Sequence, residues 1–232
     1  MRELNYFTSD LHSCGYLPRQ DAVTKFVHPP SALDNDLYND LAAKGFRRTG
    51  ELVYTPACVH CAQCVPVRLN VSEFEPSKRH VRTKKRNTDI HVTEEPGIFS
   101  NEHFELYQSY VEARHPGSTM AKLTRKQYMH FLTASWSDTI FIEFRCAKRL
   151  LAVAVSDRLK TGMSSVYTFY CPAASQRSLG NFAVLEQIDL VKKLNLQWLY
   201  LGYWIRDCKK MSYKNNFFPL QYFKHGRWGY SC

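Results

Sequence analysis

The pattern of apolar and polar residues changes along the chain near residue 97. Before that point prolines interrupt short apolar segments, so long helices are not expected there. One helix is predicted over residues 34–44, because Gly45 supplies an end signal. Proline and glycine together end regular structure, so the run 94–97 predicts a break. We therefore expect two domains, residues 1–97 and residues 98–232.

After the break, the period of the pattern predicts two helices, three strands, a helix and a strand. Apolar residues recur at helical spacing in two places, Phe104, Tyr107, Tyr110 and Val111, and then Tyr128, Phe131 and Leu132. Aromatic and β-branched residues predict strands at 139–146, 150–156, 164–170 and 198–204. Residues 179–194 show helical spacing between the last two strands.

The expected fold class is α+β, with a small irregular cysteine-containing N-terminal domain. The element order of the second domain resembles the GCN5-related N-acetyltransferase fold. In that fold a loop between a central strand and the next helix receives the acyl donor. A fold analogy alone does not establish a function.

The charge balance favours a polyanionic partner. The 232 residues include 31 Lys and Arg against 21 Asp and Glu, a net charge of +10. Nucleic acid is the first such partner to consider, whereas the alternative is that the charge only maintains solubility. The sequence has no apolar run of the roughly 18 residues that a membrane span needs, and no signal peptide at its N-terminus. We expect a soluble, cytoplasmic protein that does not contact a membrane.

Three of the eight cysteines, Cys58, Cys61 and Cys64, are spaced uniformly, and Cys14 upstream is a possible fourth ligand. Without export, disulfides are not the first expectation, and four thiolates suffice for an iron–sulfur cluster or for zinc. The alternative is a set of reduced, partly buried cysteines. The others, Cys146, Cys171, Cys208 and Cys232, stand alone in sequence, so we expect them to pack in the core and none to act as a nucleophile.

Two basic regions are candidates for binding nucleic acid. The first contains Lys78, Arg79, Arg82, Lys84, Lys85 and Arg86, with no acid before Asp89, and can neutralise several phosphates unless it is only a solvated loop. The second, residues 206–227, alternates cations with rings. Tyr203, Trp204 and Tyr213 are candidates to stack on unpaired bases, whereas burial is expected for Phe217, Phe218 and Phe223.

A loop at the junction of a strand and a helix contains Arg177, Ser178, Leu179 and Gly180. Glycine there lets backbone amides approach a phosphate or a carbonyl group at the helix N-terminus. A coenzyme A fingerprint would have Gly or Ala at position 182, where this chain has Phe182, so we expect no coenzyme A. The alternative is a plain helix start with Ser178 as N-cap.

These residues belong to a set of motifs that is specific in combination and covers nearly the whole chain. The motifs are residues 14–18, 45–48, 53–54, 58–64, 87–89, 157, 166–170, 177–180, 200–205 and 210–214. Together they resemble the bacterial leucyl-transferring branch of the arginyl-tRNA–protein transferase family. The resemblance implies leucyl-tRNA as donor, an N-terminal Asp or Glu on the acceptor protein, and entry of the product into N-degron degradation. Cys171 and Asn181 depart from the family pattern.

Such a transfer needs no enzyme nucleophile, because an aminoacyl ester is already activated. An acceptor amine with a pKa of about 8 must lose a proton, and Asp157, Tyr167 and Tyr170 are the candidate catalytic residues. Arg177, Lys210 or Lys214 is expected to bind the acceptor's acidic side chain, and the amides near Gly180 to stabilise the oxyanion. The rival hypotheses are an acetyl-coenzyme A-dependent N-acetyltransferase and a non-catalytic RNA-binding protein.

Overall fold

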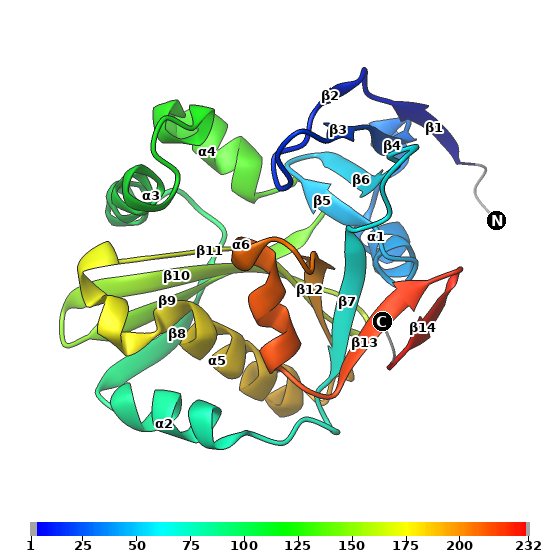
Figure 1. Ribbon diagram of the computed structural model, residues 1–232. Coiled ribbons are helices and arrows are strands. Elements are labelled where there is room, and N and C mark those ends of the chain that lie inside the picture. Colours follow the sequence, from blue (N-terminus) through cyan, green and yellow to red (C-terminus); the bar gives the residue numbers. More distant parts are fainter. Residues whose placement is uncertain (1–3, 231–232) are drawn as a thin grey trace.

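The computed structural model describes residues 4–230 (Figure 1). A small antiparallel sheet near the N-terminus has the strand order β1-β4-β6-β5, and β2 and β3 form a separate ribbon. The strands of these two sheets are β1 (Asn5–Thr8), β2 (His12–Ser13), β3 (Asp21–Ala22), β4 (Thr24–His28), β5 (Arg47–Thr49) and β6 (Leu52–Pro56).

The second, larger sheet has eight strands in the order β14-β13-β7-β12-β11-β10-β9-β8. Its pairs are antiparallel except for β11 with β12. The strands are β7 (Val65–Asn70), β8 (Ile90–Pro96), β9 (Asp138–Cys146), β10 (Arg149–Arg158), β11 (Gly162–Tyr170), β12 (Trp198–Trp204), β13 (Leu220–Lys224) and β14 (Arg227–Gly229).

Helices cover both faces of the large sheet, and α1 packs beside the small one (Figure 1). The α-helices are α1 (Asn35–Ala42), α2 (Lys78–Arg86), α3 (Asn101–Arg114), α4 (Arg125–Leu132), α5 (Leu179–Lys193) and α6 (Lys209–Ser212). Short 3-10 turns cover Pro30–Ala32, Thr119–Lys122, Pro172–Arg177 and Tyr213–Asn216. None of the helices described is long and apolar enough to cross a membrane.

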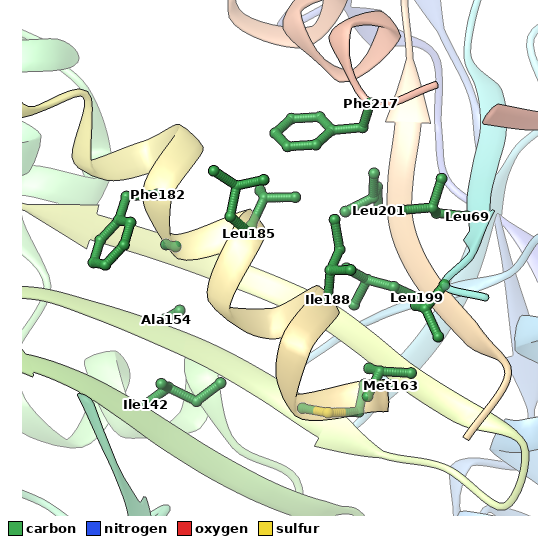
Figure 2. Packing of buried hydrophobic residues seen from close by; sticks show 14 of the residues in the cluster. Leu69, Ile142, Ala154, Met163, Phe182, Leu185, Ile188, Leu199, Leu201 and Phe217 are labelled. Atoms are coloured by element: carbon green, nitrogen blue, oxygen red, sulfur yellow. The ribbon is translucent and has the colours of Figure 1, made fainter. Parts of the chain in front are cut away.

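Alternation along the central strands explains why both faces are covered. Ile142 of β9 and Ala154 of β10 face α5, whereas Phe141 and Val153 face α3 and α4. Figure 2 shows the α5 side, where Phe182, Leu185 and Ile188 meet Met163, Leu199 and Leu69. Each fully buried side chain of this size contributes about 1.5–3 kcal/mol. This double burial fixes where β11, α5 and β12 lie.

The segments with clear periodicity were predicted correctly in type. The helices at 34–44 and 179–194 appear as α1 and α5, and the strand at 198–204 is β12. Asp34 caps α1 by accepting a hydrogen bond from the Leu37 amide at 2.7 Å. The mixed helix and sheet content agrees with the predicted α+β class.

The segment around residue 97 differs from the prediction. Residues 94–96 are no break, because they complete β8 at the outer edge of the large sheet. An edge position suits Pro96, which has no amide to donate. Strands β7 and β8 precede residue 97 and pair within the large sheet, so that sheet takes strands from both sides of the predicted domain boundary.

Candidate functional site

The parallel strands β11 and β12 pair at their N-terminal ends and then diverge. Three register pairs join them, Gly162 with Trp198, Met163 with Leu199, and Ser164 with Tyr200. Beyond these pairs, β11 runs to Tyr170 and β12 to Trp204. Helix α5 begins near the end of β11 and leads back to β12. Crevices at the carboxyl ends of parallel strands are where such sheets receive ligands.

Arg47 of β5 fills the start of the gap between the two strands. Its Nη1 donates to Ser164 Oγ at 2.8 Å and to the Tyr200 carbonyl oxygen at 3.4 Å, and its Nη2 donates to the Ser165 carbonyl oxygen. Gly202 lies beside it with φ +80°, and an added Cβ would be 3.4 Å from Arg47 Nε. Arg47 therefore supplies donors to oxygens that strand pairing leaves free.

Lys214 is a second buried cation at this gap. Its Nζ donates to the Tyr203 carbonyl oxygen at 2.5 Å, and the residue is 5% exposed. Burial, and then the nearby Arg47 charge, lower the pKa of Lys214 to about 7. Within residues 4–230, neither Arg47 nor Lys214 forms an ion pair with a carboxylate. Buried charge without an acid suits a site that takes an electron-rich ligand.

Tyrosines surround the gap near the first turn of α5. The rings of Tyr170 and Tyr110 are 4.8 Å apart, and a Cβ added to Gly180 would be 3.3 Å from Tyr170 Cε1. Tyr213 lies within electrostatic range of Tyr170 and Arg47. The structure thus brings together Tyr170, Gly180 and Tyr213, all three of which were predicted site residues.

Tyr167 contacts Tyr110 as well, with 6.3 Å between ring centroids. Its hydroxyl is buried and has no hydrogen-bond partner in the part of the chain that the structure describes. Burial raises the pKa of Tyr167, so this group remains a hydroxyl at neutral pH. It can donate a hydrogen bond to a ligand but is poorly suited to act as a base.

Asp157 lies outside this group, in an ion pair beneath the small sheet. Arg48 donates from Nε and Nη2 to its two carboxylate oxygens, each at 2.6 Å, and both side chains are 0% exposed. Thr139 Oγ1 donates to the same carboxylate at 2.7 Å. A carboxylate closed off in this way cannot reach a substrate amine, so the geometry contradicts the expected catalytic role.

The loop before α5 uses its side chains for structure. Arg177 donates to both oxygens of Asp89 at 2.8 Å and holds the pKa of that carboxyl well below its usual range. Ser178 occupies the N-cap position with φ 55°, but its side chain makes no capping bond, so the plain N-cap alternative is wrong in that detail. Leu179 is buried. The first backbone amides of α5, including those of Leu179 and Gly180, have no intrahelical acceptor and can bind an oxyanion.

The aromatic residues in and next to the second basic region differ from the prediction in which rings are buried and which are exposed. Tyr203 is buried and its hydroxyl donates to the carbonyl oxygens of Gly45 and Tyr54, both at 3.3 Å, so it offers no free face for a base. Trp204 is buried as well. Tyr213 is 37% exposed and remains available for stacking. Of the rings expected to be buried, Phe217 is 0% exposed, Phe223 is half-buried, and Phe218 is 71% exposed.

The first basic region is helix α2. Ser77 caps it by accepting a hydrogen bond from the His80 amide, and the helix packs on α5. Lys84 forms an ion pair with Asp189, and Arg86 donates to the Gln176 carbonyl oxygen at 2.5 Å. The other four cations of the region have exposed side chains: Lys78, Arg79, Arg82 and Lys85.

The four cysteines predicted as ligands line one cavity of about 530 Å³. Burial, followed by Cys14, Cys58 and Cys61, raises the pKa of the Cys64 thiol to about 12. Leu17 donates its amide to Cys14 Sγ at 3.4 Å. Within residues 4–230 no group of three or more His, Cys, Asp and Glu side chains is closed tightly enough to hold one metal ion.

The other cysteines, which stand alone in sequence, were expected to pack in the core. Cys171 and Cys208 are buried and Cys146 is half-buried, whereas Cys232 lies outside the described residues. Cys208 lies within electrostatic range of Cys64, which makes it a fifth thiol beside the ligand set.

Two residues of the site were missed as functional residues from the sequence. Arg47 was part of a matched motif but had no assigned role, and Tyr110 was taken only as an apolar residue of a helix. The available signal for a role of Arg47 was its place in sequence, shortly after Gly45 and at the start of a run of polar residues. Nothing in the local pattern separates Tyr110 from the core positions of α3.

Comparison with known proteins gives matches over almost the whole chain. Residues 12–82 match the family model for the N terminus of arginine-tRNA-protein transferase, and residues 102–224 match that for its C terminus. An aspartate/glutamate leucyltransferase of Alcanivorax borkumensis is 46% identical over 225 residues, or 97% of this chain and 93% of the relative. One from Pseudomonas syringae pv. tomato is 43% identical over 98% of this chain and 97% of the relative. The solved structure of L-PGS from Bacillus licheniformis aligns with a TM-score of 0.47 and 10% identity, over 72% of this chain and 48% of that one.

Proposed function

Because the chain belongs to the arginine-tRNA–protein transferase family, we propose that it moves leucine from leucyl-tRNA to an N-terminal Asp or Glu of acceptor proteins. The products would enter N-degron degradation in the cytoplasm. The leucine donor and the acidic acceptor rest on the names of relatives that are 41–46% identical. The observation that carries the chemistry is the gap between β11 and β12, with the α5 N-terminus and two buried cations at its edges.

The same gap supports the GCN5-related acyltransferase architecture as part of this proposal. A parallel strand pair that opens after three register pairs, with the crossover helix starting beside the opening, suits an acyl group held between strands. Arg177 is bound to Asp89 and Phe182 is buried against Phe144, with 5.7 Å between ring centroids. Both residues occupy positions that belong to the fingerprint of a coenzyme A site. Because Arg177 is held by Asp89 and Phe182 by the core, these contacts support a site that does not use coenzyme A.

Transfer then proceeds by direct attack of the acceptor amine on the ester carbon of leucyl-tRNA. The amine nitrogen forms the new amide bond, the terminal ribose hydroxyl of the tRNA leaves, and the proton released by the amine balances the one that the ribose oxygen gains. The free amides at the start of α5 stabilise the oxyanion. The hydroxyls of Tyr167 and Tyr170 orient the ester, and the site supplies proximity rather than a covalent intermediate.

Incubation of the protein with labelled leucyl-tRNA and peptides beginning with Asp, Glu, Arg or Ala tests this proposal. Leucine is expected on the Asp and Glu peptides only. Arginyl-tRNA and acetyl-coenzyme A serve as alternative donors in parallel reactions. Transfer of arginine or of acetyl groups in place of leucine would overturn the donor assignment, and tRNA binding without any product would favour a binding protein.

The tRNA-binding surface is proposed to include the exposed face of α2. Alanine at Arg79, Arg82 and Lys85 should flatten the plot of log affinity for leucyl-tRNA against log salt. The slope should change by roughly 0.7–0.9 for each phosphate that the variant no longer neutralises. Lys84→Ala is excluded because Lys84 pairs with Asp189, and Lys148→Ala, an exposed cation in the turn before β10, is the control. An unchanged slope in the triple variant would show that the helix does not touch the tRNA.

Cys14, Cys58, Cys61 and Cys64 are proposed to hold an iron–sulfur cluster, with zinc as the second choice. When bound, such a group would fix two segments to each other, the loop between β2 and β3 and the loop between β6 and β7. Anaerobically purified protein should contain iron and sulfide, and Cys61→Ser should contain neither. Active protein that contains no iron, sulfide or zinc would remove this proposal.

A further inference from the structure

Three basic side chains meet where the end of α3 approaches α6. Lys210 Nζ is 3.1 Å from His115 Nδ1, and the His115 ring packs edge-on against Tyr110 with 6.1 Å between centroids. Arg114, the last residue of α3, lies within electrostatic range of Tyr110. Two elements far apart in sequence thus present their cations to one place.

No acid neutralises this group in the described part of the chain. The ion pairs within residues 4–230 include none of Arg114, His115 and Lys210. Partial burial, with Lys210 and Arg114 as further causes, lowers the pKa of His115. His115 therefore accepts a hydrogen bond from Lys210, and the positive charges of Arg114 and Lys210 are left for a ligand with negative charge to balance.

The group lies one aromatic ring from the proposed transfer centre. Tyr110 contacts His115, lies within electrostatic range of Arg114, and packs edge-on against Tyr170 with 4.8 Å between ring centroids. Tyr170 in turn borders Gly180 at the start of α5. Lys210 and Tyr213 lie one helical turn apart, so both face the same side.

We propose that Arg114, His115 and Lys210 bind the side-chain carboxylate of the acceptor's first residue and so determine which proteins are modified. This inference rests on the proposed leucyl transfer. The acceptor's amine must reach the ester at the start of α5. The side-chain carboxylate of the same residue is only a few bonds from that amine, so it must bind close to the ester. The basic group lies at such a short distance, because only the Tyr110 ring separates it from Tyr170. The other two candidates are engaged: Arg177 with Asp89, and Lys214 with a main-chain carbonyl. Guanidinium and ammonium donors together suit a planar carboxylate.

The test compares acceptor peptides in leucyl transfer by the full-length protein. Lys210→Ala should lower kcat/KM for Asp and Glu peptides by roughly 10- to 100-fold through a higher peptide KM, with the KM for leucyl-tRNA unchanged. Lys210→Glu should lower it further and improve a peptide beginning with Arg relative to one beginning with Asp. Lys209→Ala, an exposed lysine beside Lys210, is the matched control and should behave as wild type.

Each other outcome overturns the assignment. Weaker leucyl-tRNA affinity with equal effects on all peptides would mean that the group binds tRNA phosphate. Unchanged kinetics for Asp and Glu peptides would mean that it binds neither. A wild-type protein that transfers no leucine would reject the proposed function itself, which the Lys210 variants do not address.

Discussion

Replacing Asp157 with Asn should lower the free energy of unfolding by about 3–5 kcal/mol, because it leaves the buried Arg48 charge without its partner. Arg48 and Asp157 have 0% side-chain exposure, and the carboxylate accepts three short hydrogen bonds. An amide offers only one oxygen, and its own NH₂ group would face the guanidinium. Urea denaturation of the two proteins measures the difference.

Two further variants separate this explanation from a catalytic one. Glu102→Gln removes a partner of Arg145 from an exposed pair and should change stability by less than about 1 kcal/mol. The double change Arg48→Met with Asp157→Leu should restore much of the stability, because well-packed apolar residues can replace a buried ion pair. If Asp157→Asn were as stable as wild type but inactive in transfer, Asp157 would be catalytic after all.

The position of Asp157 illustrates how much of the site could be predicted from the sequence alone. Local patterns were sufficient for β12 at 198–204 and for α1, whose cap Asp34 and end signal Gly45 are both short-range features. The identity of Asp157 as an acid in a matched motif was visible too. Its partner Arg48 lies 109 residues earlier, and no periodicity connects the two.

The site depends on such long-range pairings, which explains what was missed. Arg47 reaches Ser164 across 117 residues, and β7 joins β12 although β8, β9, β10 and β11 all lie between them in sequence. Strand order and register are set by the packing of the whole sheet. The proline and glycine near residue 97 therefore could not show that the residues before them form β8, the edge strand of the large sheet. By contrast, Tyr170 and Gly180 flank one short loop between adjacent elements, so their proximity needs no long-range pairing.

Lys214→Met should change how stability depends on pH. The folded-state pKa of Lys214 is about 7, against 10.5 for the ordinary side chain, so the unfolded chain holds more protons between these values. Wild-type stability should therefore rise with pH across this window, by up to about 1.4 kcal/mol per pH unit from this group. Below pH 7 both states are protonated, and the full penalty of the buried charge is present.

Chemical denaturation of wild type and Lys214→Met at intervals from pH 6 to pH 9 checks this expectation. The variant lacks the hydrogen bond to the Tyr203 carbonyl oxygen, which lowers its stability by about 1 kcal/mol at every pH. The informative quantity is therefore the difference in slope: the stability of wild type should increase relative to that of the variant as pH rises above 7. Lys209→Met, at an exposed lysine, should run parallel to wild type. If Lys214→Met also ran parallel, the Lys214 charge would be compensated within the protein, and the gap between β11 and β12 would need no electron-rich ligand to balance it.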